Sequence, residues 1–164
     1  MSRDNVDLII EQWKNEIPEL NTKDMAILGR LQRIVKFSER KLGENFSKFT
    51  LNSGEFDVLA TLRRSGGEFK LKPTKLYNLL MVTSGAMTNR IDTLEKKGLV
   101  NRVNDTEDRR TVYVKLTEKG LSLINEAVYE HVSVEEELLK KLTEEEKEIL
   151  NSILRKISLN LEEK

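Results

Sequence analysis

Residues 87–97 carry hydrogen-bonding side chains on one side of a predicted helix and apolar side chains on the other. At about 100° per residue, the apolar side groups three long side chains, those of Met87, Ile91 and Leu94. The opposite side groups polar residues, namely Asn89, Asp92, Thr93 and Lys96, with Thr88 at its margin. Asparagine can bind an adenine edge through two hydrogen bonds, and threonine hydroxyls bind bases or phosphates. The pattern predicts a helix that packs on its own domain and reads a major groove of DNA.

Two small residues, Ser84 and Gly85, precede that helix. A helix N-terminus offers unpaired backbone N–H groups and the positive end of the helix dipole, so it suits a DNA phosphate. An ordinary surface face of a helical hairpin is the alternative interpretation of the polar side. The β-hairpin predicted next along the chain favours DNA binding.

A polar loop at residues 104–110 ends in Arg109 and Arg110, with Asp108 beside them. Arginines at a loop tip suit a narrow minor groove, where the potential of DNA is most negative. Asp108 would repel phosphate unless it orients an arginine, and our hypothesis is that it holds Arg110 extended. A solvated loop with weak surface ion pairs is the alternative.

The elements expected to position these residues follow from periodicity, capping residues and turn formers. Helices are predicted at 5–17, from a cap at Asn21 or Thr22 to about 45, at 54–64 after a cap at Ser53, at 73–81 and at 86–97. Residues 69–72 are predicted to be extended, and residues 99–103 and 111–116 to pair as a hairpin. Two further helices are predicted between 121 and about 161, separated by a capping box at 143–146.

A short helix, a tight turn, a second helix and a hairpin are, in that order, typical of a winged helix-turn-helix. The predicted fold is therefore mainly α with a small β-hairpin. A winged helix-turn-helix DNA-binding lobe at 53–120 is flanked by N-terminal helices at 1–52 and C-terminal helices at 121–164. The amphipathic end helices cannot bury their apolar stripes on so small a centre, so both sets are expected to dimerise, with a heptad seam at 121–142. A two-fold homodimer would set its recognition helices about one duplex turn apart, roughly 34 Å.

The distribution of charge supports a nucleic-acid partner, although the total charge does not. The 164 residues include 28 basic and 28 acidic side chains, a formal net charge of zero. Residues 61–120 carry 13 basic and 7 acidic side chains, a net charge of +6, whereas 1–60 and 121–164 carry −1 and −5. Since charges act over about a Debye length, roughly 8–10 Å, the regional charge matters more than the total. Random scatter is the alternative, but the basic block coincides with the predicted DNA-binding lobe.

The composition excludes several classes of protein. Without cysteine there is no disulfide framework, thiol nucleophile or cysteine-ligated zinc, and the single His131, at a heptad position, cannot build a poly-histidine metal site. No Gly-rich phosphate loop or nucleophile elbow occurs, so no enzyme, cofactor or metal is expected. The first residues lack a secretory pattern and no apolar run nears about 18 residues, so we expect a cytoplasmic protein, bacterial or archaeal, with no membrane partner.

Several motifs resemble those of the MarR family of bacterial transcription regulators. They are TSGAMTNRID at 83–92, LEKKGLV at 94–100, Asp105, DRR at 108–110 and LTEKG at 116–120. The resemblance covers nearly the whole chain, but the flanking helices match only in pattern. It implies a homodimer built from N- and C-terminal helices, a palindromic operator, and a small-molecule effector that weakens DNA binding.

A narrower resemblance is to the urate-responsive branch of that family. This branch carries a tryptophan in an extra N-terminal helix, an aspartate before the helix-turn-helix, and arginines in the recognition helix and the first wing strand. The matching residues are Trp13, Asp57, Arg90 and Arg102. The resemblance implies that they bind the effector, a planar aromatic or urate-like molecule, since arginine can pair with an anionic ring and aspartate can accept ring N–H bonds.

Each of these four residues also has a simpler interpretation. Trp13 shares an apolar stripe and can be plain packing, Asp57 can be a surface residue near a helix N-terminus, and Arg102 can pair with an acidic neighbour. Arg90 is more informative, because it lies on the flank of the recognition helix, where it can reach a pocket while the helix contacts DNA.

The predicted function is a ligand-responsive transcriptional repressor that binds double-stranded DNA at a palindromic operator. The residues expected to contact DNA are Thr74, Ser84, Gly85, Thr88, Asn89, Thr93, Lys96, Asp108, Arg109 and Arg110. A winged-helix module used only for protein–protein assembly is the alternative, and it predicts no salt-sensitive DNA binding.

Overall fold

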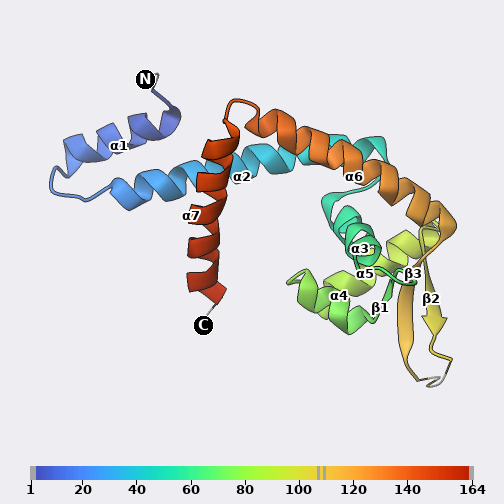
Figure 1. Ribbon diagram of the computed structural model, residues 1–164. Coiled ribbons are helices and arrows are strands. Elements are labelled where there is room, and N and C mark those ends of the chain that lie inside the picture. The colour runs from blue at the N-terminus through green and yellow to red at the C-terminus, as the bar shows by residue number, and fades with distance from the viewer. Residues whose placement is uncertain (1–2, 107, 109, 163–164) are drawn as a thin grey trace. The chain divides into compact units, whose positions relative to one another are not determined.

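The computed structural model describes residues 3–106, 108 and 110–162 (Figure 1). The chain forms two compact units, Met1–Lys41 and Leu42–Lys164. In the described residues, ten elements follow one another: α1 (Asn5–Glu16), α2 (Lys23–Lys48), α3 (Ser53–Arg64), β1 (Lys70–Leu71), α4 (Pro73–Leu79), α5 (Ser84–Lys96), β2 (Val100–Asn104), β3 (Val112–Leu116), α6 (Glu118–Leu139) and α7 (Glu144–Glu162). Helices dominate and the strands are short, so the predicted mainly α fold with a β-hairpin is confirmed.

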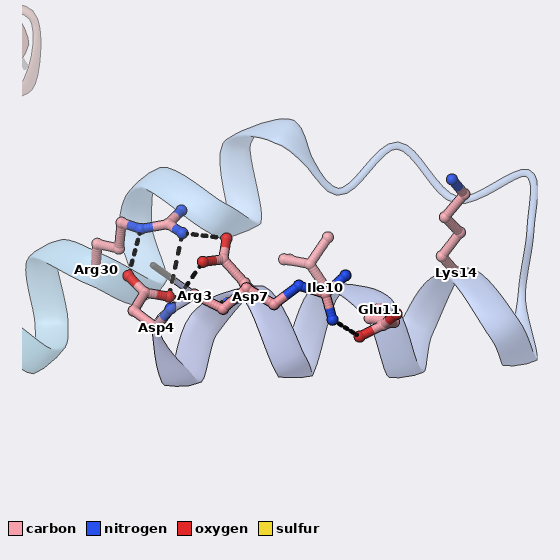
Figure 2. Close-up of a pocket in the computed structure, with 7 residues that line it drawn as sticks. All are labelled: Arg3, Asp4, Asp7, Ile10, Glu11, Lys14 and Arg30. Carbon is pink, nitrogen blue, oxygen red and sulfur yellow. Dashed lines mark hydrogen bonds and ion pairs between the residues drawn. The ribbon is translucent and has the colours of Figure 1, made fainter. Parts of the chain in front are cut away.

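The first unit holds α1 and most of α2. Asp4 caps α1, because its side chain accepts hydrogen bonds from the backbone N–H groups of Val6 and Asp7. Arg30 of α2 then binds both carboxylates, at 2.8 Å from Asp4 Oδ2 and 2.5 Å from Asp7 Oδ1 (Figure 2). These hydrogen bonds lower the pKa of Asp4 and raise that of Arg30. The ion pairs of Arg30 with Asp4 and Asp7 therefore hold the start of α1 on α2.

The second unit has a three-stranded antiparallel sheet in the order β1–β3–β2. The hairpin of β2 and β3 is as predicted, with Arg102 opposite Val114. The extended segment predicted at 69–72 becomes a third strand, since Lys70 and Leu71 pair with Lys115 and Val114 of β3. Figure 1 shows the hairpin projecting from the helices of this unit.

Two predicted helix starts were wrong, each because another residue supplies the cap. Asn52, not Ser53, caps α3: its Oδ1 accepts from the Glu55 N–H at 2.9 Å, and the Glu55 carboxylate accepts from the Asn52 N–H at 2.9 Å. The capping box needs a glutamate three residues after the cap, which selects Asn52. Helix α5 begins at Ser84 rather than at residue 86, because the Thr83 hydroxyl accepts from the Ala86 N–H.

The core of the second unit joins α3, α4, α5, α6 and the sheet. Its fully buried side chains include Leu59, Leu62, Leu76, Met87, Ile91, Leu94, Val100, Val114 and Ile124. The three from α5 are the apolar side predicted from periodicity, and burial of each such side chain contributes about 1.5–3 kcal/mol. Phe46, near the end of α2, stacks on Phe56 of α3 with ring centroids 4.3 Å apart.

The C-terminal end of α5 is packed directly against the start of α6. Gly98, with a φ of +69°, ends the helix, and its carbonyl accepts a hydrogen bond from the Thr117 hydroxyl at 2.8 Å. Lys119 Nζ donates to the Lys97 carbonyl at 2.9 Å. A Cβ on Gly120 would lie 2.0 Å from the Leu99 carbonyl oxygen, so only glycine permits this approach.

An ion pair with a buried carboxylate holds the same end of α5 against α3. Lys97 Nζ lies 2.7 Å from Glu55 Oε2, and it also donates to the Thr50 carbonyl at 2.8 Å. Glu55 is only 3% exposed, so its carboxylate depends on this cation and on the Asn52 N–H.

Helix α7, all of whose residues lie in the described part, buries none of them. Its exposed apolar residues include Ile149, Leu150, Ile153, Leu154, Ile157 and Leu161. A contiguous apolar stripe of this kind marks an interaction surface. None of the described helices is long and apolar enough to cross a membrane.

Replacing Gly120 with alanine is expected to destabilise the fold by about 1–3 kcal/mol, because the new Cβ meets the Leu99 backbone, which cannot turn aside. Gly43→Ala is the matched control, since a Cβ there meets nothing within 4 Å, and alanine favours a helix by roughly 0.5–1 kcal/mol. Urea unfolding followed by circular dichroism measures both. Equal stability of the two variants would contradict the close packing of α6 on Leu99.

Candidate nucleic-acid interface

The exposed side of α5 carries the polar residues singled out in the sequence. Thr88, Asn89, Thr93 and Lys96 are all exposed, opposite the buried Met87, Ile91 and Leu94. Within the described part of the chain, the Asn89 side-chain amide and the Lys96 ammonium take part in no hydrogen bond or ion pair. They therefore remain available to a base edge and to a phosphate, respectively.

The two threonines of this side are bonded to the helix itself. The Thr88 hydroxyl donates to the Ser84 carbonyl at 3.0 Å, and the Thr93 hydroxyl donates to the Asn89 carbonyl at 2.9 Å. Their oxygens can still accept hydrogen bonds, and their methyl groups remain available for apolar contact with thymine.

The start of α5 is open to a phosphate. Ser84 and Gly85 are exposed, and a Cβ placed on Gly85 would meet nothing within 4 Å. Thr74, in the first turn of α4, is also exposed. Binding of a phosphate by the backbone N–H groups at this exposed helix start stays a prediction.

Asp108 organises the loop of the wing. Its carboxylate accepts hydrogen bonds from the Arg110 N–H at 3.1 Å and the Thr111 hydroxyl at 3.1 Å, and these bonds lower its pKa. Arg110 Nε lies 3.4 Å from Asp108 Oδ1, and the Arg110 side chain is 95% exposed. The contact between Asp108 and Arg110 thus exists as hypothesised, while Arg109 lies outside the described residues.

Arg102 pairs with α5. Its guanidinium lies 2.5 Å from Asp92 Oδ1 and contacts Glu95, whose other oxygen accepts from the Arg102 N–H at 3.1 Å. The hydrogen bond that Arg102 donates to Asp92 is the main cause that raises the pKa of Arg102. The simpler interpretation, pairing with an acidic neighbour, is therefore what the structure shows, and the charge of Asp92 is neutralised next to the expected DNA surface.

Arg90 lies on the flank of α5 and reaches the first turn of α3. A Cβ on Gly54 would lie 2.6 Å from Arg90 Cζ and Nε, so the guanidinium occupies the space that the glycine leaves. Asp57 lies one helical turn further along α3. Burial raises the pKa of Asp57, and the charges of Arg90, His131 and Arg64 oppose that rise. Arg90 is thus close enough for its charge to act on Asp57, and the binding of an effector by the two residues stays a prediction.

The four candidate effector residues are only partly assembled. Asp57 and Arg90 interact, Arg102 is bound to Asp92 and Glu95, and Trp13 belongs to the first unit. Trp13 is 39% exposed. Its place beside the effector stays a prediction.

Sequence reasoning missed two residues near Asp57. Gly54 was not considered, although glycine inside a helix costs about 0.5–1 kcal/mol and so signals a close approach. His131 was considered only as a residue at a heptad position and as an insufficient metal ligand. Its ring lies 4.8 Å from that of Phe56 and 5.6 Å from that of Phe46, and its Nδ1 is buried with no hydrogen-bond partner among the described atoms.

The comparisons with known proteins agree on one family. A sequence model of the MarR family matches residues 51–112. The regulator PecS of Dickeya dadantii is 40% identical over 153 residues, which cover 93% of this chain and 92% of PecS. The multiple antibiotic resistance protein MarR of Escherichia coli is 34% identical, over 79% of this chain and 90% of MarR. The crystal structure of a mutant MarR from E. coli complexed with operator DNA matches with a TM-score of 0.70 and 30% identity, over 88% of this chain and 96% of that one.

The Arg90→Met variant is expected to raise the pKa of Asp57, because it removes a cation that favours the ionised carboxylate. The matched control is Arg102→Met, since Arg102 pairs with Asp92 and Glu95 and is not among the causes of the Asp57 shift. The pKa is measured from the pH dependence of the Asp57 carboxyl carbon by NMR. Similar shifts in both variants would contradict the selective pairing of Arg90 with Asp57.

Proposed function

The chain belongs to the MarR family of transcription regulators, and from this premise we propose that it represses transcription by binding a palindromic operator as a homodimer. A small planar effector then releases it. The observation that carries the proposal is the exposed side of α5, where Asn89 and Lys96 have no partner in the described chain while the opposite side is buried in the core. Lobes of this kind place such a side in the major groove.

The charge of the DNA-binding lobe supports the same proposal. Residues 61–120 have a net charge of +6, and phosphate contacts by lysine and arginine supply most of non-specific DNA affinity. The negative charge of the segments on either side of the lobe disfavours binding of DNA to other parts of the protein. The E. coli MarR mutant, which is 30% identical to this chain, was solved in complex with operator DNA. This similarity favours the same partner for this chain.

We propose that a second copy of the chain buries the exposed apolar residues of the terminal helices in a homodimer interface. Among them are Ile27, Ile34 and Val35 of α2, Leu138 of α6, and Ile149, Ile153 and Ile157 of α7. The division of the chain into a DNA-binding lobe at 53–120 and dimerisation segments at 1–52 and 121–164 is part of this proposal. A regulator of this type acts on the chromosome in the cytoplasm, with no catalytic step and no cofactor.

The proposed effector site is the pair of Asp57 and Arg90. An anionic or amide-edged ring can pair with the planar guanidinium of Arg90 and donate hydrogen bonds from its N–H groups to Asp57. Urate has both features, and Trp13 and Arg102 are the further residues proposed to surround it. Because Arg90 is on α5, an effector that draws it from Gly54 also tilts α5. A tenfold loss of operator affinity requires a difference of only about 1.4 kcal/mol between the two states.

Binding to DNA upstream of the protein's own gene is the first test, measured by mobility shift over a range of salt concentrations. Asn89→Ala is expected to cost about 1–3 kcal/mol of operator affinity, and to lower the preference over non-specific DNA. Arg110→Ala is expected to weaken binding to all sequences and, because it removes one contact from each of the two wings, to reduce the salt slope by about 2.

Arg155→Ala, which removes the same charge from an exposed position on α7, is the control for Arg110→Ala and should leave the slope unchanged. Wild-type protein that binds no duplex in a salt-sensitive way would instead support the protein–protein assembly module.

Effector release is tested by titrating urate and salicylate into the operator complex. Urate is expected to release wild-type protein and to require a higher concentration with Asp57→Asn, since the amide cannot accept ring N–H bonds at both atoms. Release by salicylate and not by urate would show that the effector is a simple aromatic acid rather than urate. Release by neither molecule would overturn the effector part of the proposal while leaving operator binding intact.

A further inference from the structure

The outer side of the small sheet gathers lysines around one aromatic ring. Tyr113 and Lys115 alternate along β3 with the buried Val114 and Leu116, so they lie on the side of the sheet that faces away from the core. Lys70 of β1 pairs directly with Lys115. Lys70 Nζ lies 5.2 Å, and Lys72 Nζ 5.8 Å, from the centroid of the Tyr113 ring.

This lysine face, defined as Lys70, Lys72 and Lys115 around Tyr113, is not explained by stability of the fold. Like charges directly opposite on neighbouring strands repel one another. One carboxylate, that of Glu68, serves both Lys70 at 3.2 Å and Lys115 at 3.0 Å. Lys72 has no carboxylate partner among the described residues, and the three ammonium groups leave the face with excess positive charge.

Lys72 is also an unfavourable residue for its position. It is the N-cap of α4, where Ser, Thr, Asp or Asn would accept a hydrogen bond, and it forms no side-chain cap. A cation there opposes the helix dipole. Its ammonium group instead lies over the Tyr113 ring. An external anion would relieve the repulsion that this arrangement creates.

The lysine face is continuous with the wing. Tyr113 lies one residue pair from Asn104 and Val112, the last pair before the wing loop. The other side of the hairpin faces α5, as the contacts of Arg102 with Asp92 and Glu95 show. Tyr113 therefore lies next to the wing loop, on the side of the hairpin that faces away from α5.

We propose that the lysine face binds the phosphate backbone of duplex DNA beyond the segment that the wing contacts. The inference rests on the proposed function, because it presumes that α5 and the wing are already on DNA. It adds a sequence-independent contact that lengthens the DNA segment needed for full affinity. The contacts are of the lysine–phosphate type, with Tyr113 keeping two of the ammonium groups together through cation–π attraction.

The test compares two duplexes that share the operator. One ends just outside the wing contacts, and the other extends by about one helical turn, roughly 10 base pairs, on each side. Affinity is measured by fluorescence anisotropy at several salt concentrations. Wild-type protein is expected to bind the longer duplex about fivefold more tightly and with a steeper salt slope.

The Lys70→Gln/Lys72→Gln variant is expected to bind the short duplex like wild type and to lose the gain from the flanks. Because each subunit of the homodimer loses two lysine–phosphate contacts, the slope on the long duplex is expected to fall by about 4. The control, Lys14→Gln/Lys156→Gln, removes the same charge from exposed positions on α1 and α7 and should keep the gain. Thermal unfolding confirms that each variant is folded.

Three results would overturn the inference. Equal affinity of wild type for the two duplexes removes the flanking contact and leaves operator binding intact, and it would assign the lysine face to an acidic protein instead. Equal weakening of both duplexes by the double variant places the lysines within the operator contact. Failure of wild type to bind either duplex contradicts the proposed function itself.

Discussion

The orientation of α5 depends on how its C-terminal end is fixed. Lys97 joins the buried carboxylate of Glu55 at the start of α3, and the carbonyls of Lys97 and Gly98 accept hydrogen bonds from the first residues of α6. These hydrogen bonds oppose movement of α6 away from the junction, and the close approach of Gly120 to the Leu99 carbonyl leaves no room for movement towards it. A helix so held at one end presents its polar side in a single direction, which is what readout of a base edge requires.

The flank of α5 is less constrained than its end. Arg90 reaches Gly54 through a flexible side chain, and its charge opposes the rise that desolvation causes in the pKa of Asp57. A ligand that competes for Arg90 would act on the flank of α5, away from the fixed C-terminal junction. The same helix thus belongs to both the proposed effector site and the DNA surface, and coupling between them needs no path through distant parts of the molecule.

Periodicity and turn chemistry were sufficient to identify which elements the second unit contains, though not every helix start, and to separate the two sides of α5. Burial of Met87, Ile91 and Leu94 follows from their spacing, and Gly98 ends the helix where its type predicts. The cap of α3 was misassigned because Asn52 and Ser53 are both good caps and only Glu55 decides between them. The contact of Arg90 with Gly54 and the lysine face join segments far apart in sequence, and spacing along the chain carries no information about them.

Hydroxyl-radical footprinting of the operator complex tests the central claim, that two copies of α5 read two half-sites of one operator. The account predicts two symmetry-related protected regions whose centres are about one helical turn, roughly 34 Å, apart, with further protection outside each of them from the wings. A footprint without two-fold symmetry, or a single protected region that keeps its extent when one half-site is replaced, would contradict it.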